Sequence, residues 1–472
     1  MYLVRIKKTG PVVMRGLCLL VVFAALPWPL PTGDALAADQ ETEYVVYRHF
    51  EVAEEDGVVT ALTPLAEDAP PLWAREVSQQ RYDWSAGPAP DTPYFEGPIV
   101  YVLPPPEGSG EPFMTHNHQP AITWLENGDL MAVWYTTEKE AGAELTVLAS
   151  RMRAGADAWD PSSEFFKAPR RNMHGSAIFY DGTGTLFHFN GMGPDSGAGW
   201  AHLALLMRTS HDNGVAWSPP RAIGPCVTGR KQVIAGTIKT ANGVLVQPCD
   251  ATPDGDGGTA LHISRDGGAT WRDPGADKPT PAFEDGAVGE GTIAGIHAGV
   301  VELRDGRLMA FGRGDTINER MPKSVSSDLG ETWTYSATPF PPIRSGQRLV
   351  LRRLHEGPIL LVSFTDFGRP GRNRKGMEFT NADGNTFFGH GMFAALSFDD
   401  GETWPVRKLL TPGGPERELD GGAWTGAFIM DATHAEPRGY LAATQSPDGV
   451  IHLISSRLHY RFNLAWLQTP NQ

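Results

Sequence analysis

Short apolar runs recur along the chain, and each follows a tight turn that contains glycine. In RDGRLMAFGR, residues 304–313, the turn leads into a short, largely apolar run. An Asx-Gly turn before such a run is typical of a β-hairpin. Equivalent segments occupy residues 126–135, 181–189, 241–248, 355–364 and 447–456. Six hairpins of this kind predict six blades.

A second repeat lies between the hairpins. The octet S-x-D-x-G-x-x-W occurs at residues 210–217, 264–271, 326–333 and 397–404, and a longer, degenerate copy occupies residues 150–159. We expect each octet to be a turn in which the aspartate accepts backbone hydrogen bonds, the glycine adopts a positive φ and the tryptophan packs into the blade. These structural aspartates are Asp212, Asp266, Asp328 and Asp399. An EF-hand calcium loop needs more oxygen ligands and a terminal glutamate, which the octets lack.

The intervals between Trp159, Trp217, Trp271, Trp333 and Trp404 each suit one four-stranded blade with its turns. The composition, with 54 glycines and 39 prolines, also favours short strands over long helices. The predicted fold is therefore all-β, a six-bladed β-propeller of four-stranded antiparallel blades.

The N-terminus has the order of residues found in an export signal. Basic residues between positions 5 and 15 precede the apolar run GLCLLVVFAALPWPL, and DALAADQ then supplies the small residues of a cleavage site after Ala37. We expect a signal peptide at 1–37, an N-terminal extension at 38–94 that either adds a strand pair to the propeller or precedes it, and a propeller domain at 95–472. An uncleaved anchor is the alternative, although the apolar run is shorter than the roughly 20 residues that span a bilayer. The expected location is periplasmic or secreted, with no stable membrane span after cleavage.

The net charge restricts the classes of binding partner, and the cysteine content restricts the possible disulfide and metal sites. The net charge of −15 disfavours nucleic acid and anionic membranes as partners of the whole molecule. Cys18 lies in the signal, which leaves Cys226 and Cys249 as either one disulfide or two buried thiols. Their spacing resembles no zinc site.

Octets that alternate with D-G-x-L hairpins behind a signal peptide resemble the sialidase superfamily, over roughly residues 95–465. The resemblance implies a six-bladed propeller with glycoside hydrolase activity. Active members are similar in using three arginines that bind the substrate carboxylate, a tyrosine nucleophile activated by a glutamate, and an aspartate acid/base. Bidentate guanidinium groups are natural partners of a carboxylate.

The site positions of that family are matched unevenly here. Tyr440, in RGYLAATQSPDGV, resembles the nucleophile, and Arg320 matches the second arginine. Histidines stand at three other positions: His118 at the first arginine, His297 near the activating glutamate and His390 near the third arginine.

The acid/base position has no aspartate on its own strand, which is followed by Glu138 and Glu140. Asp315, in the polar stretch GRGDTINERMPKS, is the carboxylate that we select for this role, because arginines flank it.

Segments that precede the inner strands of a propeller converge on its axis, and here they carry arginines and histidines. We therefore expect one electropositive pocket in an acidic protein. The candidate catalytic residues are Tyr440, His297, His118 and Asp315. The candidate substrate-binding residues are Arg171, His174, Arg230, Arg320, Arg348 and His390.

Four of these histidines, His118, His174, His297 and His390, each precede a strand rich in small residues. They are general acid/base groups, ligands of one metal, or hydrogen-bonded core residues. Tyr440 likewise is either catalytic or a buried ring with its hydroxyl at the rim. The recurrence at equivalent positions favours a functional role for the set, and neither a metal nor a cofactor is predicted.

The function predicted from the sequence is an exported, sialidase-like glycoside hydrolase that acts on an anionic oligosaccharide or polysaccharide containing sialate or uronate. Two alternatives stay open. One is a uronate-directed lyase or rhamnosidase-type propeller that uses axial His and Tyr, and the other is a propeller that binds glycans without catalysis.

Overall fold

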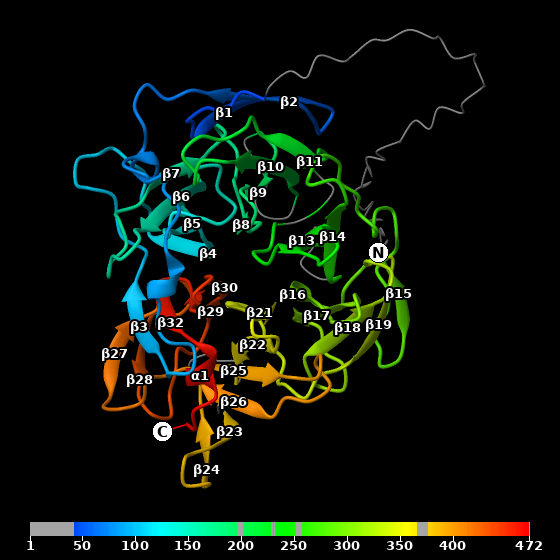
Figure 1. The fold of residues 1–472 in the computed structure, drawn as a ribbon. Coiled ribbons are helices and arrows are strands. Elements are labelled where there is room, and N and C mark those ends of the chain that lie inside the picture. The colour runs from blue at the N-terminus through cyan, green and yellow to red at the C-terminus, as the bar shows by residue number, and fades with distance from the viewer. Residues whose placement is uncertain are drawn as a thin grey trace, which may run out of the picture. The chain divides into compact units, whose positions relative to one another are not determined.

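Six antiparallel sheets are arranged around a common centre as the blades of a propeller (Figure 1). The structure is a computed structural model that describes residues 42–195, 202–227, 230, 232–251, 257–365 and 376–471. The all-β, six-bladed prediction is confirmed. The predicted signal peptide, residues 1–37, lies outside the described residues.

The first three blades are built from consecutive strands. Blade 1 contains β4 (His116–Trp124), β5 (Leu130–Thr137), β6 (Thr146–Met152) and β7 (Ser163–Phe166). Blade 2 contains β8 (Ser176–Tyr180), β9 (Leu186–Met192), β10 (Ala204–Ser210) and β11 (Arg221–Gly224). Blade 3 contains β12 (Ile238–Lys239), β13 (Leu245–Asp250) and β14 (Thr259–Ser264), and a single bridge between Ile263 and Arg272 stands where the other two have a fourth strand.

Among the last three blades, one has an extra strand and another closes the ring. Blade 4 contains β16 (Ile296–Glu302), β17 (Leu308–Arg313), β18 (Pro322–Ser326) and β19 (Thr332–Ala337), with β15 (Val288–Glu290) added at its outer edge. Blade 5 contains β21 (Val350–Arg353), β22 (Ile359–Phe364), β25 (Met392–Ser397) and β26 (Val406–Leu409). Blade 6 contains β30 (Ala442–Gln445), β31 (Ile451–Ile454) and β32 (Leu458–Phe462), and its outer strand is the early β3 (Phe95–Val100). Pairing of β3 with β32 joins the two ends of the propeller sequence in one sheet.

Shorter elements lie outside the blades. They are the hairpins β1 (His49–Glu55) with β2 (Val58–Leu65), β23 (Met377–Thr380) with β24 (Thr386–Gly389), and β27 (Arg417–Asp420) with β28 (Ala427–Met430); the parallel pair β20 (Gln347–Arg348) and β29 (Gly439–Tyr440); the helix α1 (Leu464–Leu467); and the 3-10 turns η1 (Leu72–Ala74) and η2 (Trp84–Ala86). None of the helices among the described residues is both long and apolar enough to cross a membrane.

The N-terminal segment packs on blades 1 and 2. The hairpin β1–β2 is preceded by a bridge from Val45 to Trp217, and the Tyr47 hydroxyl donates to the Ser218 carbonyl oxygen at 2.8 Å. Further along, the Trp73 indole N–H donates to the Glu164 carbonyl oxygen at 2.8 Å. An extra strand pair therefore exists, and it forms a sheet of its own beside the propeller.

The repeated octets form the turns that follow the third strand of four blades. In the copy after β18, the Ser326 hydroxyl donates to Asp328 at 2.8 Å, and Asp328 also accepts the backbone N–H of Thr332 at 2.9 Å. Gly330 has φ +87°, and Trp333 is 1% exposed. Asp212, Asp266 and Asp399 accept the corresponding serine and backbone hydrogen bonds. Each octet thus fixes its turn through one carboxylate.

We expect Asp399→Asn to lower stability at pH 7 and to weaken the response of stability to acid. Hydrogen bonds from the Thr403 hydroxyl and backbone N–H lower the pKa of Asp399 from 3.8 to about 2. Because the folded pKa lies below the unfolded one, the stabilisation is complete above pH 4 and is lost as the pH falls toward 2. Urea unfolding at pH 7 and pH 3 measures the difference. Asp383→Asn, at an exposed turn aspartate between β23 and β24, is the control and should behave like the parent.

Candidate active site

The inner strand of each blade is the first in the chain, and the residues that begin these strands gather at one end of the propeller axis. Inner strands of neighbouring blades contact one another, as β4 does with β8 and β30. Six buried side chains stand just before or at the start of these strands: His118, His174, Gln232, His297, Arg348 and Tyr440. We call these six residues the axial set.

Tyr440 is the centre of this set. Its hydroxyl oxygen accepts a hydrogen bond from Arg313 Nη1 at 2.8 Å and lies 3.1 Å from His297 Nε2. The parallel pairing of β20 with β29 places Arg348 directly opposite Tyr440, and the Arg348 guanidinium lies 5.2 Å from the centre of the tyrosine ring. The His118 ring approaches the same ring at 4.1 Å between centroids. The phenol is therefore held between two guanidinium groups and two imidazoles.

His297 is fixed from behind by Asp250. One carboxylate oxygen of Asp250 accepts the backbone N–H of His297 at 2.9 Å, and the other lies 3.5 Å from His297 Nδ1. His297 has φ +52°, a left-handed conformation that is strained for a residue other than glycine. The backbone bond to Asp250 stabilises that conformation and aims Nε2 at Tyr440. Asp250, His297 and Tyr440 thus stand in line, as an acid, a base and a hydroxyl do in a catalytic triad.

Two glutamine side chains connect His174, the remaining histidine of the axial set, to Asp250 and His297. Gln232 donates from Nε2 to Asp250 at 2.8 Å and lies 3.0 Å from His297 Nε2, while its Oε1 accepts from His174 Nε2 at 2.7 Å. Gln119 contacts both Gln232 and His174. Every member of this network is buried. The amides therefore fix the positions of the imidazoles without adding charge.

Burial keeps the axial imidazoles neutral. It lowers the pKa of His297 well below 6.5, and the nearby Arg313 and Arg348 lower it further. Burial also lowers the pKa of His118 well below 6.5 and that of His174 to about 4. At neutral pH His297 consequently has a lone pair that can accept the proton of Tyr440.

A second group of side chains, which is partly exposed, lies beside the axial set, and we call this place the mouth of the site. Glu140 accepts the Tyr135 hydroxyl at 2.7 Å and lies 3.3 Å from His116 Nε2. Although burial alone would raise it, the hydrogen bonds from His116 and Tyr135 hold the pKa of Glu140 well below its usual range. Trp424, which is 52% exposed, meets the His116 ring edge to face at 5.5 Å.

The structure brings together five of the residues selected from the sequence, namely Tyr440, His297, His118, His174 and Arg348. The other five lie elsewhere. Arg171 is paired with Glu54 of β1 at 2.5 Å, Arg230 with Asp273 at 2.5 Å, and the His390 ring stacks on His434 at 5.2 Å. Arg320 is exposed and Asp315 half-buried in the turn between β17 and β18. Arg313, not Arg320, is the arginine that contacts Tyr440.

Three important members were not selected from the sequence: Arg313, Asp250 and Gln232. Arg313 and Asp250 end the second strands of their blades, where an antiparallel hairpin returns to the start of the inner strand. The pairing of Ile296 with Arg313 shows this register. Gln232 directly follows a basic pair and occupies in blade 3 the place that His297 holds in blade 4. Attention to both ends of each hairpin, rather than to charge alone, would have found all three.

Within the described ranges, no group of three or more His, Cys, Asp or Glu side chains is arranged to hold a metal ion. Cys226 and Cys249 do not form a disulfide with each other, and burial raises the pKa of the Cys249 thiol well above 9.

Comparison with known proteins agrees with this fold. Residues 128–453 match the model of the BNR repeat-like domain. The chain belongs to this family. It is 25% identical over 384 residues to a sialidase of Micromonospora viridifaciens, a match that covers 74% of the chain and 51% of that protein. The chain thus spans about half the length of this curated relative.

Solved structures of low identity share the propeller. The intramolecular trans-sialidase of Ruminococcus gnavus superposes with a TM-score of 0.50 at 14% identity, over 79% of this chain and 98% of that one. The NanB sialidase of Streptococcus pneumoniae gives 0.50 at 13% identity, over 78% and 70%. A protein of unknown function from Dyadobacter fermentans gives 0.51 at 15% identity, over 78% and 98%. These likenesses establish a sialidase-like fold and nothing finer.

We expect the stability of the protein to fall as the pH drops from 6.5 to 4, and His174→Gln to reduce that fall. The unfolded chain binds a proton at His174 near pH 6.5, whereas the folded chain does so only near pH 4. Each such histidine therefore lowers the free energy of unfolding by about 1.4 kcal/mol for each unit by which the pH falls within that window. Urea unfolding between pH 7.5 and 4.5 measures the slope. His211→Gln, at an exposed histidine, is the control, and equal slopes in all three proteins would contradict the buried neutral state.

Proposed function

We propose that the protein is an exported glycoside hydrolase of the sialidase type, which cleaves the glycosidic bond of an anionic sugar with Tyr440 as nucleophile. The observation that carries the proposal is the environment of the Tyr440 hydroxyl, between His297 Nε2 at 3.1 Å and Arg313 Nη1 at 2.8 Å. A hydroxyl beside a neutral base, with the base held by a carboxylate, is the arrangement of an activated nucleophile.

In the first step, Tyr440 Oη attacks the anomeric carbon and transfers its proton to His297 Nε2. A glycosyl-tyrosine bond forms while the glycosidic carbon–oxygen bond breaks. The positive charge that arises on His297 is balanced by Asp250, and Arg313 stabilises negative charge on Oη before attack is complete. In the second step, water attacks the anomeric carbon, the bond between that carbon and Tyr440 Oη breaks, and His297 returns the proton to Tyr440 Oη.

The proton for the leaving group comes from the mouth of the site. His116 and Glu140 share a hydrogen bond there at 3.3 Å, and both side chains are partly exposed. This pair protonates the departing oxygen in the first step and receives a proton from the attacking water in the second. Tyr135, bonded to Glu140 and paired across β4–β5 with His118, connects the pair to the axial set.

The charge of the site supports an anionic substrate. Arg313 and Arg348 contribute two positive charges beside Tyr440, while the carboxylates of Asp250 and Glu140 lie against His297 and His116. A carboxylate on the sugar would bind the guanidinium groups next to the phenol. The exposed Trp424 at the mouth supplies an aromatic face on which a sugar ring can stack.

The first test compares wild type, Tyr440→Phe and Tyr335→Phe on sialosides and on uronate-containing polysaccharides. We expect wild type and Tyr335→Phe to release the acidic sugar, and Tyr440→Phe to lose at least about a thousandfold in kcat, because no nucleophile remains. Tyr335 is a matched control, since it is buried and donates to the Thr292 carbonyl oxygen at 2.7 Å in blade 4.

Other outcomes of the same assay contradict the proposal in distinct ways. Unsaturated uronate products would indicate a lyase in which His297 and Tyr440 abstract a proton. Saturable binding of the glycans with no product at any pH would indicate a binding propeller. Mass spectrometry of the secreted chain, with a first residue at position 38, tests the export part of the proposal.

We expect Arg313→Gln to reduce the preference for an acidic sugar over its carboxyl-reduced analogue by roughly 10- to 100-fold. Hydrogen bonds to charged groups contribute about 1.5–3 kcal/mol, which corresponds to that range. The ratio of kcat/KM values for the two substrates is the measurement. Arg320→Gln, at the exposed arginine that follows in the same loop, should leave the ratio unchanged, and the opposite pattern would move the carboxylate site to Arg320.

A further inference from the structure

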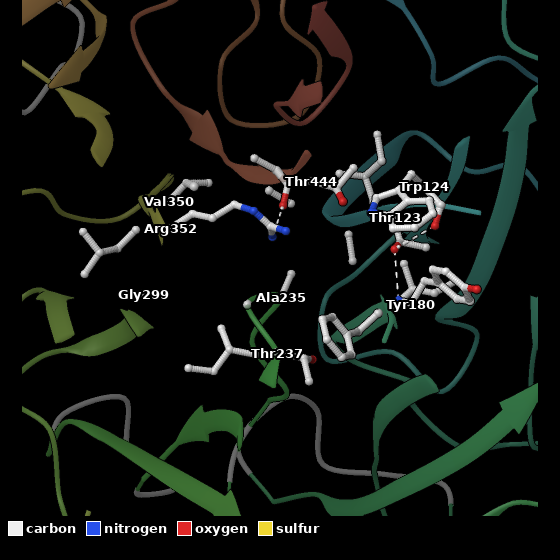
Figure 2. A pocket seen from close by; sticks show the side chains of 18 of the residues that line it. Thr123, Trp124, Tyr180, Ala235, Thr237, Gly299, Val350, Arg352 and Thr444 are labelled. Atoms are coloured by element: carbon white, nitrogen blue, oxygen red, sulfur yellow. Dashed lines mark hydrogen bonds between the residues drawn. The ribbon is translucent and has the colours of Figure 1, made fainter. Parts of the chain in front are cut away.

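A cavity lies among the inner strands of all six blades (Figure 2). It has a volume of about 60 Å³. In each blade, the residues that line it follow the axial residue by one to six positions along the inner strand: Ala121 to Trp124 follow His118, and Ala442 to Thr444 follow Tyr440. Because a strand rises about 3.3 Å per residue, the cavity lies farther along the propeller axis, away from Tyr440.

One charged side chain enters this cavity. Among the described residues that line it, Arg352 alone is charged, and Figure 2 shows its guanidinium pointing into the space between Thr444 and Ala235. Arg352 Nη1 makes a long hydrogen bond of 3.4 Å to the Ala443 carbonyl oxygen. Arg352 as a whole is half-buried, but its Nε atom is buried and has no hydrogen-bond partner among the described residues. Burial lowers the pKa of Arg352 to about 10, so the group remains charged at neutral pH.

None of the described residues that line the cavity is a carboxylate that could balance that charge. The lining is otherwise formed by apolar and aromatic residues, glycines and the three threonines Thr123, Thr237 and Thr444. The hydroxyl groups of Thr123 and Thr237 are engaged with Trp124 and Gln247. The buried part of a charged group is costly unless an opposite charge or hydrogen bonds compensate it. The unsatisfied Nε–H therefore marks where a compensating group would sit.

We propose that this cavity is a binding site for one small monovalent inorganic anion, of chloride or bromide size, held by Arg352 Nε and Nη groups. The size fits, because a single water needs roughly 10–15 Å³ of such a cavity, which leaves room for one ion with a few waters but not for a sugar. The single positive charge fits a monovalent ion. The site is separate from the substrate site and stabilises the closed ring of inner strands at its centre.

Thermal unfolding of the purified mature chain in sodium bromide tests the proposal, with sodium gluconate keeping the ionic strength constant. We expect the unfolding midpoint of wild type to rise and saturate with bromide, because an ion that binds only the folded chain stabilises it by mass action. Arg352→Gln should remove the saturating rise. Arg353→Gln is the matched control, since Arg353 is the next residue on β21 and is paired with Asp400 at 2.7 Å outside the cavity; its rise should be kept even if its midpoint is lower.

A second measurement does not depend on a variant that folds. Crystals of wild type soaked in bromide should give an anomalous peak within hydrogen-bond distance of Arg352 Nε. An equal bromide response in wild type and Arg352→Gln, or bromide peaks only at the protein surface, would overturn the proposal. Neither result bears on glycoside hydrolysis, because Arg352 is not part of the axial set.

Discussion

The hydrogen bond from the backbone N–H of His297 to Asp250 is the interaction on which the candidate site depends. It holds His297 at φ +52°, and this conformation directs Nε2 toward Tyr440. Asp250 ends a strand of blade 3, His297 lies at the start of the inner strand of blade 4, and Tyr440 precedes the inner strand of blade 6 by two residues. The site therefore exists only when the blades are packed around the axis. Closure of the ring by β3 and β32 is in this sense also a condition for the chemistry.

The axis collects positive charge in a protein that is acidic overall. Arg313 and Arg348 lie beside Tyr440 at one end, and Arg352 lies farther along the channel, while the whole chain carries a net charge of −15. The buried parts of guanidinium groups are costly alone, so each group needs hydrogen bonds, a phenol or an anion. In the proposed function, a substrate carboxylate compensates the two arginines beside the phenol. The third is out of reach of a sugar, and this difference separates the two sites chemically.

Much of the fold could be predicted because its signals are local. An octet such as SSDLGETW carries its own turn, with Ser326, Asp328 and Gly330 within five residues, so it can be recognised without knowledge of its neighbours. The same holds for the six hairpin turns. Tyr440 and His297 could also be predicted from the sequence, because each lies at or just before the start of an inner strand.

The rest of the site depends on pairing across strands, which the sequence does not display. Arg313 reaches Tyr440 because Ile296 pairs with Arg313 in blade 4, a register interrupted by a bulge between Ile296 and Gly299. Arg171 and Arg230 have the right charge and the right blades, yet each is paired with a nearby carboxylate. A prediction based on charge alone therefore included two arginines whose charge is already balanced by a carboxylate.

A histidine at the position where the resemblance implies a glutamate changes the charge beside Tyr440 as well as the hydrogen-bond partner of its hydroxyl. A glutamate there would add a negative charge beside Tyr440 and would repel an incoming carboxylate. Neutral His297 adds none, and Asp250 lies behind it at 3.5 Å from Nδ1, on the side away from the phenol. Histidines also stand at two arginine positions of the implied clamp, His118 at the first and His390 near the third, so two positive charges are missing from it. Relative to the arrangement that the resemblance implies, the three exchanges remove one negative and two positive charges. Arg313 and Arg348 stand beside Tyr440 instead, so the positive charge next to the phenol comes from other arginines than those of the implied clamp.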